Sequence, residues 1–272
     1  MTVKILALGD VVGQPGCRAL FMGLQSLVKR TRADVVIVNG ENAAAGLGLT
    51  PDLAAGFFKV GVDVITSGNH IWQRREIFPL LDSEERLLRP ANYPNGVPGK
   101  GHCLISKKKC SIAVINLEGR QNLNTLRCPF QVGKDLVKRL RSKANIILID
   151  FHAESPGEKE ALALFLDGQV SALFGTHTHV QTADEKVLPG GTGFITDLGM
   201  TGPAESVIGM KREISIKRSL MQIPFKMEVE EGPPVIMGIL LEIDADSGKT
   251  VAIRRIRQDF PALGEDEDNS PP

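Results

Sequence analysis

Two histidines stand one residue apart in the second half of the chain, at His177 and His179. They follow the apolar run 170–174, which predicts a buried strand ending at Gly175. If the backbone stays extended, residues i and i+2 point the same way, so both imidazoles would face one spot beyond the strand. Two neutral imidazoles that converge in this way are a common start of a metal site. The alternative interpretation is a pair of surface histidines in a turn.

Metal-binding side chains also follow four other apolar segments. These are Asp10 after residues 3–8, Glu41 and Asn42 after 34–38, Asn69 and His70 after 62–66, and His152 after 146–149. Ligands of open α/β sheets bind at the carboxyl ends of the strands, so we expect these side chains to meet at one edge. A helix cap or a turn would explain any one of them. Five strand ends in one chain favour a shared site.

The donor atoms in this set are carboxylate, carboxamide and imidazole, without thiolate. Such donors suit iron, manganese or zinc better than an iron–sulfur centre or an all-oxygen calcium site. A catalytic zinc ion usually takes three protein ligands. This chain offers seven candidates: Asp10, Glu41, Asn42, Asn69, His152, His177 and His179. Seven ligands fit two ions about 3.5–4 Å apart with one bridging carboxylate, an arrangement used for in-line displacement at phosphorus. Either Glu41 or Asp10 could be the bridge.

His70 adjoins Asn69 and should lie close to the metals without necessarily binding them. Imidazole titrates near neutral pH, so His70 could protonate a departing alkoxide oxygen. It could equally orient one of the ligands. Its position in the sequence does not separate the two roles.

Strands and helices alternate along the chain, which predicts an α/β fold. Helices are expected at Arg18–Lys29, from Thr50-Pro51 onward, at 132–143 and at 158–166. Residues 83–103 are rich in proline and glycine and predict loops, and the segments 235–242 and 250–257 predict a hairpin. We expect one domain over residues 1–260 and a disordered acidic tail over 261–272.

Composition excludes several classes of protein. Lys+Arg and Asp+Glu both number 32, which argues against stable nucleic-acid binding and against a polybasic membrane anchor. No apolar run approaches the roughly 20 residues of a membrane-spanning helix. The four cysteines form no CxxC pair and no signal-peptide pattern is seen, so we expect a cytoplasmic protein with reduced thiols.

Seven segments together resemble the YmdB-like metallophosphoesterases of bacteria. They are Gly9–Gly13, Asn39–Ala44, Thr66–Trp72, Arg89–Pro94, Asp150–Glu154, Gly175–Asp184 and Thr196–Pro203. The resemblance extends from about residue 3 to residue 257, in the expected order. It implies a calcineurin-like α/β/β/α sandwich, in which two mixed sheets are flanked by helices.

The same resemblance implies a dinuclear metal centre, with iron first and manganese or zinc as alternatives. Carried over to this sequence, one ion would be held by Asp10, Glu41, Asn42 and His179, and the other by Glu41 as bridge with Asn69, His152 and His177. His70 would be the general acid. The implied activity is hydrolysis of cyclic nucleotides, above all 2′,3′-cyclic nucleotides, by a metal-activated hydroxide. The expected partners are a small-molecule substrate and further copies of the chain in a homo-oligomer.

Two other functions remain open. A pair of metal ions could instead cleave an amide. The chain could also be a regulatory metal-binding protein that acts through a partner or RNA, with weak catalysis. Trp72 could stack on a base, and Arg120 or Lys211 could contact phosphate, but a core tryptophan and solvated charges are the simpler interpretations.

Overall fold

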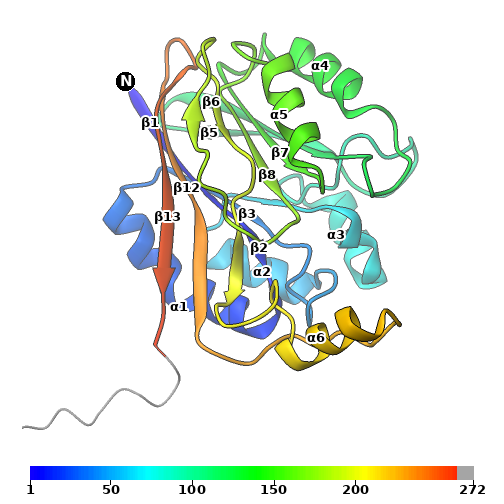
Figure 1. Ribbon diagram of the computed structural model, residues 1–272. Coiled ribbons are helices and arrows are strands. Elements are labelled where there is room, and N and C mark those ends of the chain that lie inside the picture. Colours follow the sequence, from blue (N-terminus) through cyan, green and yellow to red (C-terminus); the bar gives the residue numbers. More distant parts are fainter. Residues whose placement is uncertain (262–272) are drawn as a thin grey trace, which may run out of the picture.

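Two mixed β-sheets lie face to face, and helices cover the outer side of each (Figure 1). This is a computed structural model that describes residues 1–261; the predicted acidic tail, except Pro261, lies outside the described residues. The four-layer arrangement confirms the predicted α/β/β/α sandwich. None of the helices among residues 1–261 is both long enough and apolar enough to span a membrane.

The first sheet has seven strands in the order β2-β11-β12-β1-β3-β4, with β13 paired to β12. Their bounds are β1 Thr2–Leu8, β2 Asp10–Val11, β3 Val35–Asn39, β4 Val64–Thr66, β11 Met200–Pro203, β12 Pro234–Asp244 and β13 Thr250–Asp259. The strands β1, β3 and β4 are parallel, whereas β12 runs antiparallel to β1. The parallel strands therefore end at the same side of the sheet.

The second sheet has six strands in the order β5-β6-β7-β8-β10-β9. Their bounds are β5 His102–Lys107, β6 Cys110–Glu118, β7 Ile146–His152, β8 Ala172–Thr176, β9 Lys186–Val187 and β10 Gly193–Ile195. The four strands β6, β7, β8 and β10 are parallel to one another, and the edge strands β5 and β9 are antiparallel to β6 and β10. This sheet, too, gathers the ends of its parallel strands on one side.

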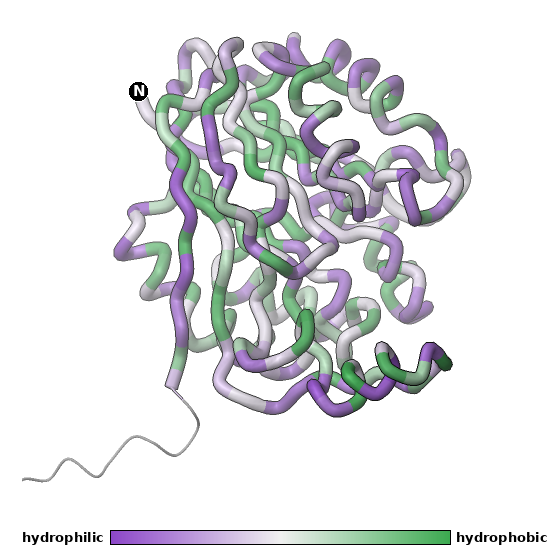
Figure 2. The backbone as a smooth tube through the Cα atoms, viewed as in Figure 1, coloured by the Kyte–Doolittle hydropathy of each residue, from purple (hydrophilic) through white to green (hydrophobic). Residues whose placement is uncertain are grey.

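The alternation of side chains along the central strands explains why both faces are buried. In β1, Val3, Ile5 and Ala7 pack in the layer between the sheets, whereas Leu6 and Leu8 face the helices. Successive side chains of a strand point to opposite faces, so a strand covered on both sides must be apolar throughout. Figure 2 shows the resulting apolar inner strands and the polar outer strand β13.

The helices of the first sheet are α1 Gly13–Thr31, α2 Pro51–Lys59 and α3 Phe78–Ser83. The 3-10 helices η1 Asn69–Gln73 and η2 Arg75–Ile77 lie between β4 and α3. The second sheet is covered by α4 Pro129–Leu140 and α5 Pro156–Phe165. As predicted, Thr50 starts α2, because its hydroxyl accepts a hydrogen bond from the backbone N–H of Leu53 at 3.3 Å.

Two helices were not predicted from the sequence, the short α3 and the longer α6. The helix α6, Arg212–Met221, lies beyond the ends of the sheets rather than on either face (Figure 1). Only Ser215 of its ten residues is buried. It therefore lacks the apolar stripe by which a core-packed helix is recognised in a sequence.

Candidate metal centre

The carboxyl ends of β1, β3 and β4 in one sheet and of β7 and β8 in the other meet on one side of the molecule. The seven predicted ligands and His70 follow these five strands and lie together there. The donors thus come from two facing sheets, whereas strand ends alone had suggested a single edge. The reason is that β7 and β8 lie in the sheet with β6 and β10, whereas β1, β3 and β4 lie in the other sheet.

One group of donor atoms surrounds His152. Its Nε2 atom lies 3.1 Å from each of three atoms: Glu41 Oε1, Asn69 Oδ1 and His177 Nδ1. Nitrogen and oxygen ligands bonded to one ion at about 2.0–2.1 Å lie roughly 3 Å apart, so this spacing fits a shared metal. Among residues 1–261, one group of at least three histidine, cysteine, aspartate or glutamate side chains has all its ligand atoms within 4.8 Å of one another. It consists of Glu41, His152 and His177.

A second group of donors surrounds Asn42. Its Nδ2 group donates to Asp10 Oδ1 and Glu41 Oε1, both at 3.4 Å, and lies 3.2 Å from His179 Nε2. A carboxamide binds a metal only through its oxygen, so Asn42 would serve as a ligand with its amide rotated to place Oδ1 among these atoms. The distance from His179 Nε2 to Asp10 Oδ1 is 3.7 Å. Because Glu41 Oε1 belongs to both groups, its carboxylate lies between them. This position favours Glu41 over Asp10 as the shared ligand.

The backbone at the two neighbouring histidines differs from the sequence prediction. The strand β8 ends at Thr176, and His177 and His179 have φ angles of 100° and 65°, so neither is extended. Their imidazoles reach different donor groups because the chain turns between them. The N–H of His177 donates to Asp10 Oδ2 at 3.1 Å, and His179 Nδ1 lies 2.8 Å from the carbonyl oxygen of Ile208.

His152 is held in place on two sides. Its Nδ1 atom lies 3.0 Å from Thr176 Oγ1, which directs Nε2 toward the donors. The ring packs directly on the backbone at Gly68, where a Cβ atom would lie 2.1 Å from the His152 Cδ2 atom. A residue with a side chain at position 68 would therefore displace His152 from Asn69.

The electrostatic potential at the site is set by two buried carboxylates and favours a bound cation. Burial raises the pKa of the Glu41 carboxyl, but the nearby His152 and His70 outweigh burial and lower that pKa well below its usual range. Burial likewise opposes ionisation of Asp10, but its hydrogen bond and charge interaction with His179 lower the pKa overall. Two fully buried carboxylates are thus held ionised. Buried charges of this kind need cationic partners.

The two histidines around Glu41 respond in opposite directions. Burial lowers the pKa of His152, but the Glu41 carboxylate outweighs it and raises the pKa to about 9. Burial and the charge of His152 together lower the pKa of His177 to about 4. One proton therefore occupies the pair at neutral pH. A metal ion must displace that proton, so metal affinity should rise with pH.

His70 lies beside both donor groups. Its Nδ1 atom is 2.7 Å from Asn42 Oδ1 and 3.3 Å from Glu41 Oε1, and its backbone N–H donates to Glu41 Oε2 at 3.0 Å. Since these contacts occupy Nδ1, the other ring nitrogen, Nε2, is the atom available to a substrate. The side chain is 29% exposed, whereas Glu41 is fully buried.

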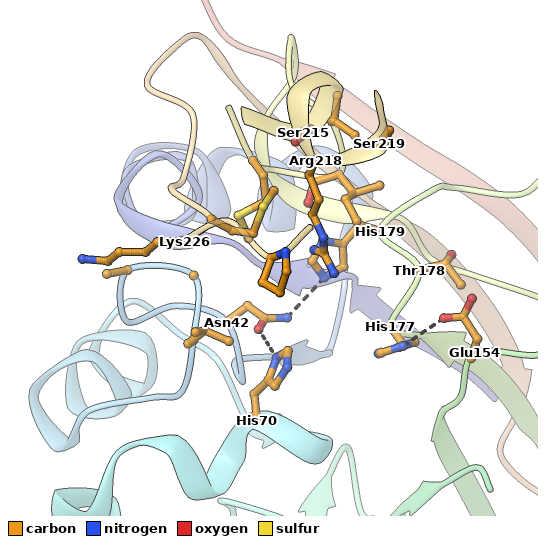
Figure 3. A pocket seen from close by; sticks show the side chains of 18 of the residues that line it. Asn42, His70, Glu154, His177, Thr178, His179, Ser215, Arg218, Ser219 and Lys226 are labelled. Atoms are coloured by element: carbon orange, nitrogen blue, oxygen red, sulfur yellow. Dashed lines mark hydrogen bonds and ion pairs between the residues drawn. The ribbon is translucent and has the colours of Figure 1, made fainter. Parts of the chain in front are cut away.

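A cleft of about 1230 Å³ opens over the donors. Its floor includes Asn42, His70, His177 and His179, and its outer wall is formed by α6 and the segment 222–227 (Figure 3). Figure 3 shows Arg218 of α6 reaching into the cleft on the side of His179. An anionic substrate in this cleft would thus meet both imidazoles and a guanidinium.

Comparison with known proteins identifies the family. The model of the YmdB-like proteins matches residues 6–256. This chain belongs to the YmdB-like family. It is 44% identical to a 2′,3′-cyclic-nucleotide 2′-phosphodiesterase of Bacillus subtilis over 254 residues, which cover 93% of this chain and 96% of the relative.

Two solved structures are similar along almost their whole length. A protein from Thermus thermophilus described as hypothetical has a TM-score of 0.89 and 38% identity, covering 95% of this chain and 100% of that one. A structure described as a novel phosphatase from Mycoplasma pneumoniae has a TM-score of 0.90 and 33% identity, covering 96% and 95%. Both have the fold described above.

In this YmdB-like chain, two further carboxylates lie near the site and were given no role from the sequence. Glu154 Oε2 is 3.0 Å from His177 Nε2. Glu118 ends β6 opposite His152 and is fully buried, and burial raises the pKa of its carboxyl. The rule of polar residues at strand ends would have found Glu118, because β6 is parallel to β7.

Three side chains considered as substrate contacts lie elsewhere. Trp72 packs edge-on against Phe78 and Tyr93, with ring centroids 5.9 and 5.1 Å apart. Lys211 pairs with Glu228 at 2.7 Å. Neither these two residues nor Arg120 are among the described residues that line the cleft. The simpler interpretations, a packed tryptophan and surface charges, fit these positions.

Proposed function

We propose that this chain is a metal-dependent phosphodiesterase that hydrolyses cyclic nucleotides, most of all 2′,3′-cyclic nucleotides. The observation that carries the proposal is the pair of donor groups that share Glu41 beneath an open cleft, with His70 beside both. The name of the Bacillus subtilis relative supports the same substrate class.

The donor set fits two metal ions of intermediate softness. We assign Asp10, Glu41, Asn42 and His179 to one ion, and Glu41, Asn69, His152 and His177 to the other. When bound, two such ions supply Lewis acidity, a nucleophile at neutral pH and charge neutralisation at the phosphoryl group. We propose iron as the native metal, following the resemblance to the YmdB-like family. Manganese and zinc are alternatives, because imidazole and carboxylate ligands accommodate all three metals.

The protein's own groups complete the reaction. His70, held at Nδ1 by Asn42, places Nε2 where it can give a proton to the ribose oxygen that leaves phosphorus. Arg218 faces the floor of the cleft and would bind a phosphoryl oxygen. The apolar side chains of Ile208, Met210 and Met227 also line the cleft and offer a surface for the base.

Several properties of the whole protein are proposals as well. We propose that residues 1–260 form a single domain, since both sheets contribute to the core between them. A homo-oligomer is supported by apolar side chains on α6, where Ile216 is 55% and Leu220 79% exposed. The four cysteines are free thiols, which supports a reducing cytoplasm.

The test combines metal analysis with a substrate panel. Protein purified without oxygen should contain close to two metal ions per chain. After chelation, activity should return when iron or manganese is added back, with 2′,3′-cyclic nucleotides hydrolysed faster than 3′,5′-cyclic nucleotides. Hydrolysis of amides but not of phosphodiesters would contradict the proposal. So would full restoration of a deletion strain by His70→Ala and Asn69→Ala variants, which would favour a regulatory binding protein.

A further inference from the structure

The turn that carries the two neighbouring histidines is held in an uncommon backbone conformation. Two of its three residues, His177 and His179, have positive φ angles, which usually occur at glycine. Such a conformation is strained and persists only where the surrounding structure imposes it. The groups that hold this turn therefore determine where both imidazoles point.

Two carboxylates hold the backbone of the turn. Asp10 Oδ2 accepts from the N–H of His177 at 3.1 Å, and Asp197 Oδ2 accepts from the N–H of Thr178 at 3.2 Å. Asp10 is itself a candidate ligand, but Asp197 is not. Its other oxygen, Oδ1, accepts from the N–H of Gly199 at 2.9 Å, which fixes the plane of the carboxylate.

Asp197 forms a buried ion pair with Lys159 of α5. The Lys159 Nζ atom lies 2.7 Å from Asp197 Oδ2, and both side chains are 0% exposed. Burial raises the pKa of Asp197, and the ammonium group opposes that rise. Stability alone explains such a pair poorly, because an apolar pair of similar size is often equally stable or better.

The path of Lys159 links three elements of the site. Its side chain crosses the end of β8 at Gly175, where a Cβ atom would lie 2.7 Å from Lys159 Cδ and 1.8 Å from the carbonyl oxygen of Thr196. Only glycine leaves room for this crossing. The helix that carries Lys159 starts four residues after His152, the centre of one donor group.

We propose that Lys159 and Asp197 are positioning residues, whose ion pair fixes the Thr178 amide and so directs His177 and His179 to their separate donor groups. Neither residue touches substrate. The inference rests on the proposed metal centre. It assigns a role to a buried pair that neither binds the metals nor takes part in proton transfer.

The first test replaces the pair without leaving a lone buried charge. The variant is Lys159→Met with Asp197→Leu. The control is Leu27→Ala, a core substitution on the buried face of α1 that lowers stability away from the site. Chelator-treated proteins are titrated with Co²⁺ by calorimetry and by the absorption spectrum of the bound ion. We expect the double variant to unfold cooperatively and to bind Co²⁺ about 10- to 100-fold more weakly, with the control unchanged.

A second measurement needs no variant and decides the matter if the double variant does not fold. In metal-free wild-type protein, the Thr178 amide should exchange with solvent slowly, although it lies in a turn. Fast exchange of this amide, or equal Co²⁺ affinity of wild type and double variant, would overturn the inference. If wild-type protein bound no Co²⁺ at all, the proposed function itself would fail, and the two failures are thus separable.

Discussion

The Nδ1 atom of His70 contacts Asn42 and Glu41, two residues that we assign as metal ligands. This contact is compatible with two roles: orienting Asn42, or donating a proton from the other nitrogen. The sequence left both open, and the geometry favours the second, because the side chain reaches the cleft while Glu41 stays buried. The two roles make different kinetic predictions.

We expect His70→Ala to lower kcat for a 2′,3′-cyclic nucleotide by about 10²- to 10⁴-fold, the usual contribution of a general acid. Metal content should be unchanged. Hydrolysis of bis(4-nitrophenyl) phosphate should fall much less, because nitrophenolate leaves without protonation. Parallel kinetics on both substrates with metal analysis provide the check. Equal losses on both, together with lost metal, would show that His70 orients a ligand instead.

Asp184 gives a prediction for stability. Burial raises the pKa of its carboxyl, but hydrogen bonds from Thr182 and Thr196 outweigh burial and lower it overall. A lowered pKa in the folded state stabilises the fold above the unfolded value of about 3.9, and this contribution is lost as pH falls through the folded pKa. Asp184→Asn should therefore lower Tm at pH 7 and pH 5, and lower it less near pH 2.

Thermal unfolding of chelator-treated protein at these pH values measures the effect. Asp135→Asn, at an exposed position of α4, is the matched control and should leave Tm unchanged at each pH. A loss of Tm in Asp184→Asn that is equally large at pH 2 and pH 7 would contradict a charge-dependent role.

At the level of elements, the central parallel strands were predictable and the wall of the cleft was not. The strands β1, β3, β4, β6, β7 and β8 are almost wholly buried, so they appear in the sequence as apolar runs whose ends are marked by polar residues. The strands β2, β5, β9, β10 and β11 are short or partly exposed and were not predicted. The helix α6 packs only Ser215 into the interior. The role proposed for α6 depends on its position beside the cleft, and the hydrophobic periodicity of its sequence does not predict that position.

The role assigned to α6 predicts a change in KM. Replacing Arg218 with Ala should raise KM for a 2′,3′-cyclic nucleotide about 10-fold or more, the loss expected for a hydrogen bond to a charged group, with a smaller effect on kcat. Lysine at this position should restore part of the affinity, because it keeps the charge but not the planar fork.

Arg212→Ala on the same helix is the control for Arg218. Arg212 pairs with Glu205 at 3.0 Å and is not among the described residues lining the cleft. The KM of the Arg212→Ala variant should match that of the wild-type protein. Equal KM values for all three proteins would remove Arg218 from the substrate site.

For the whole molecule, metal binding should stabilise the fold. Glu41 and Asp10 are buried and ionised, so metal that binds only the folded state should add about 2.7 kcal/mol at a concentration of 100 Kd. Chelation should therefore lower Tm, and added Mn²⁺ should restore it. An unchanged Tm after complete metal removal would contradict the site.

The single tryptophan provides a direct signal for this titration. Trp72 lies in η1 with Asn69 and His70, so its fluorescence should report metal binding. Saturation is expected near two equivalents of Mn²⁺ in the wild-type protein. His179→Ala should leave one strong site, since His179 contacts only the donor group around Asn42 and Asp10.

The sequence by itself determined the residue types, the strand ends that carry them and the resemblance to a family. These features are local, because an apolar run, a glycine and the polar residue after it lie within a few positions of one another. From them follow the α/β/β/α fold and the full list of candidate ligands. Glu118 also ends an apolar run and could have been found in the same way, whereas Glu154 and Arg218 could not.

Only the tertiary structure decided how these residues are arranged. Glu41 lies between two donor groups because β3 and β7, more than a hundred residues apart in the chain, belong to facing sheets. The left-handed turn at His177 and His179 is imposed by Asp10 and Asp197, which come from different elements. Such contacts depend on how the layers pack, and no local pattern of residues encodes that packing.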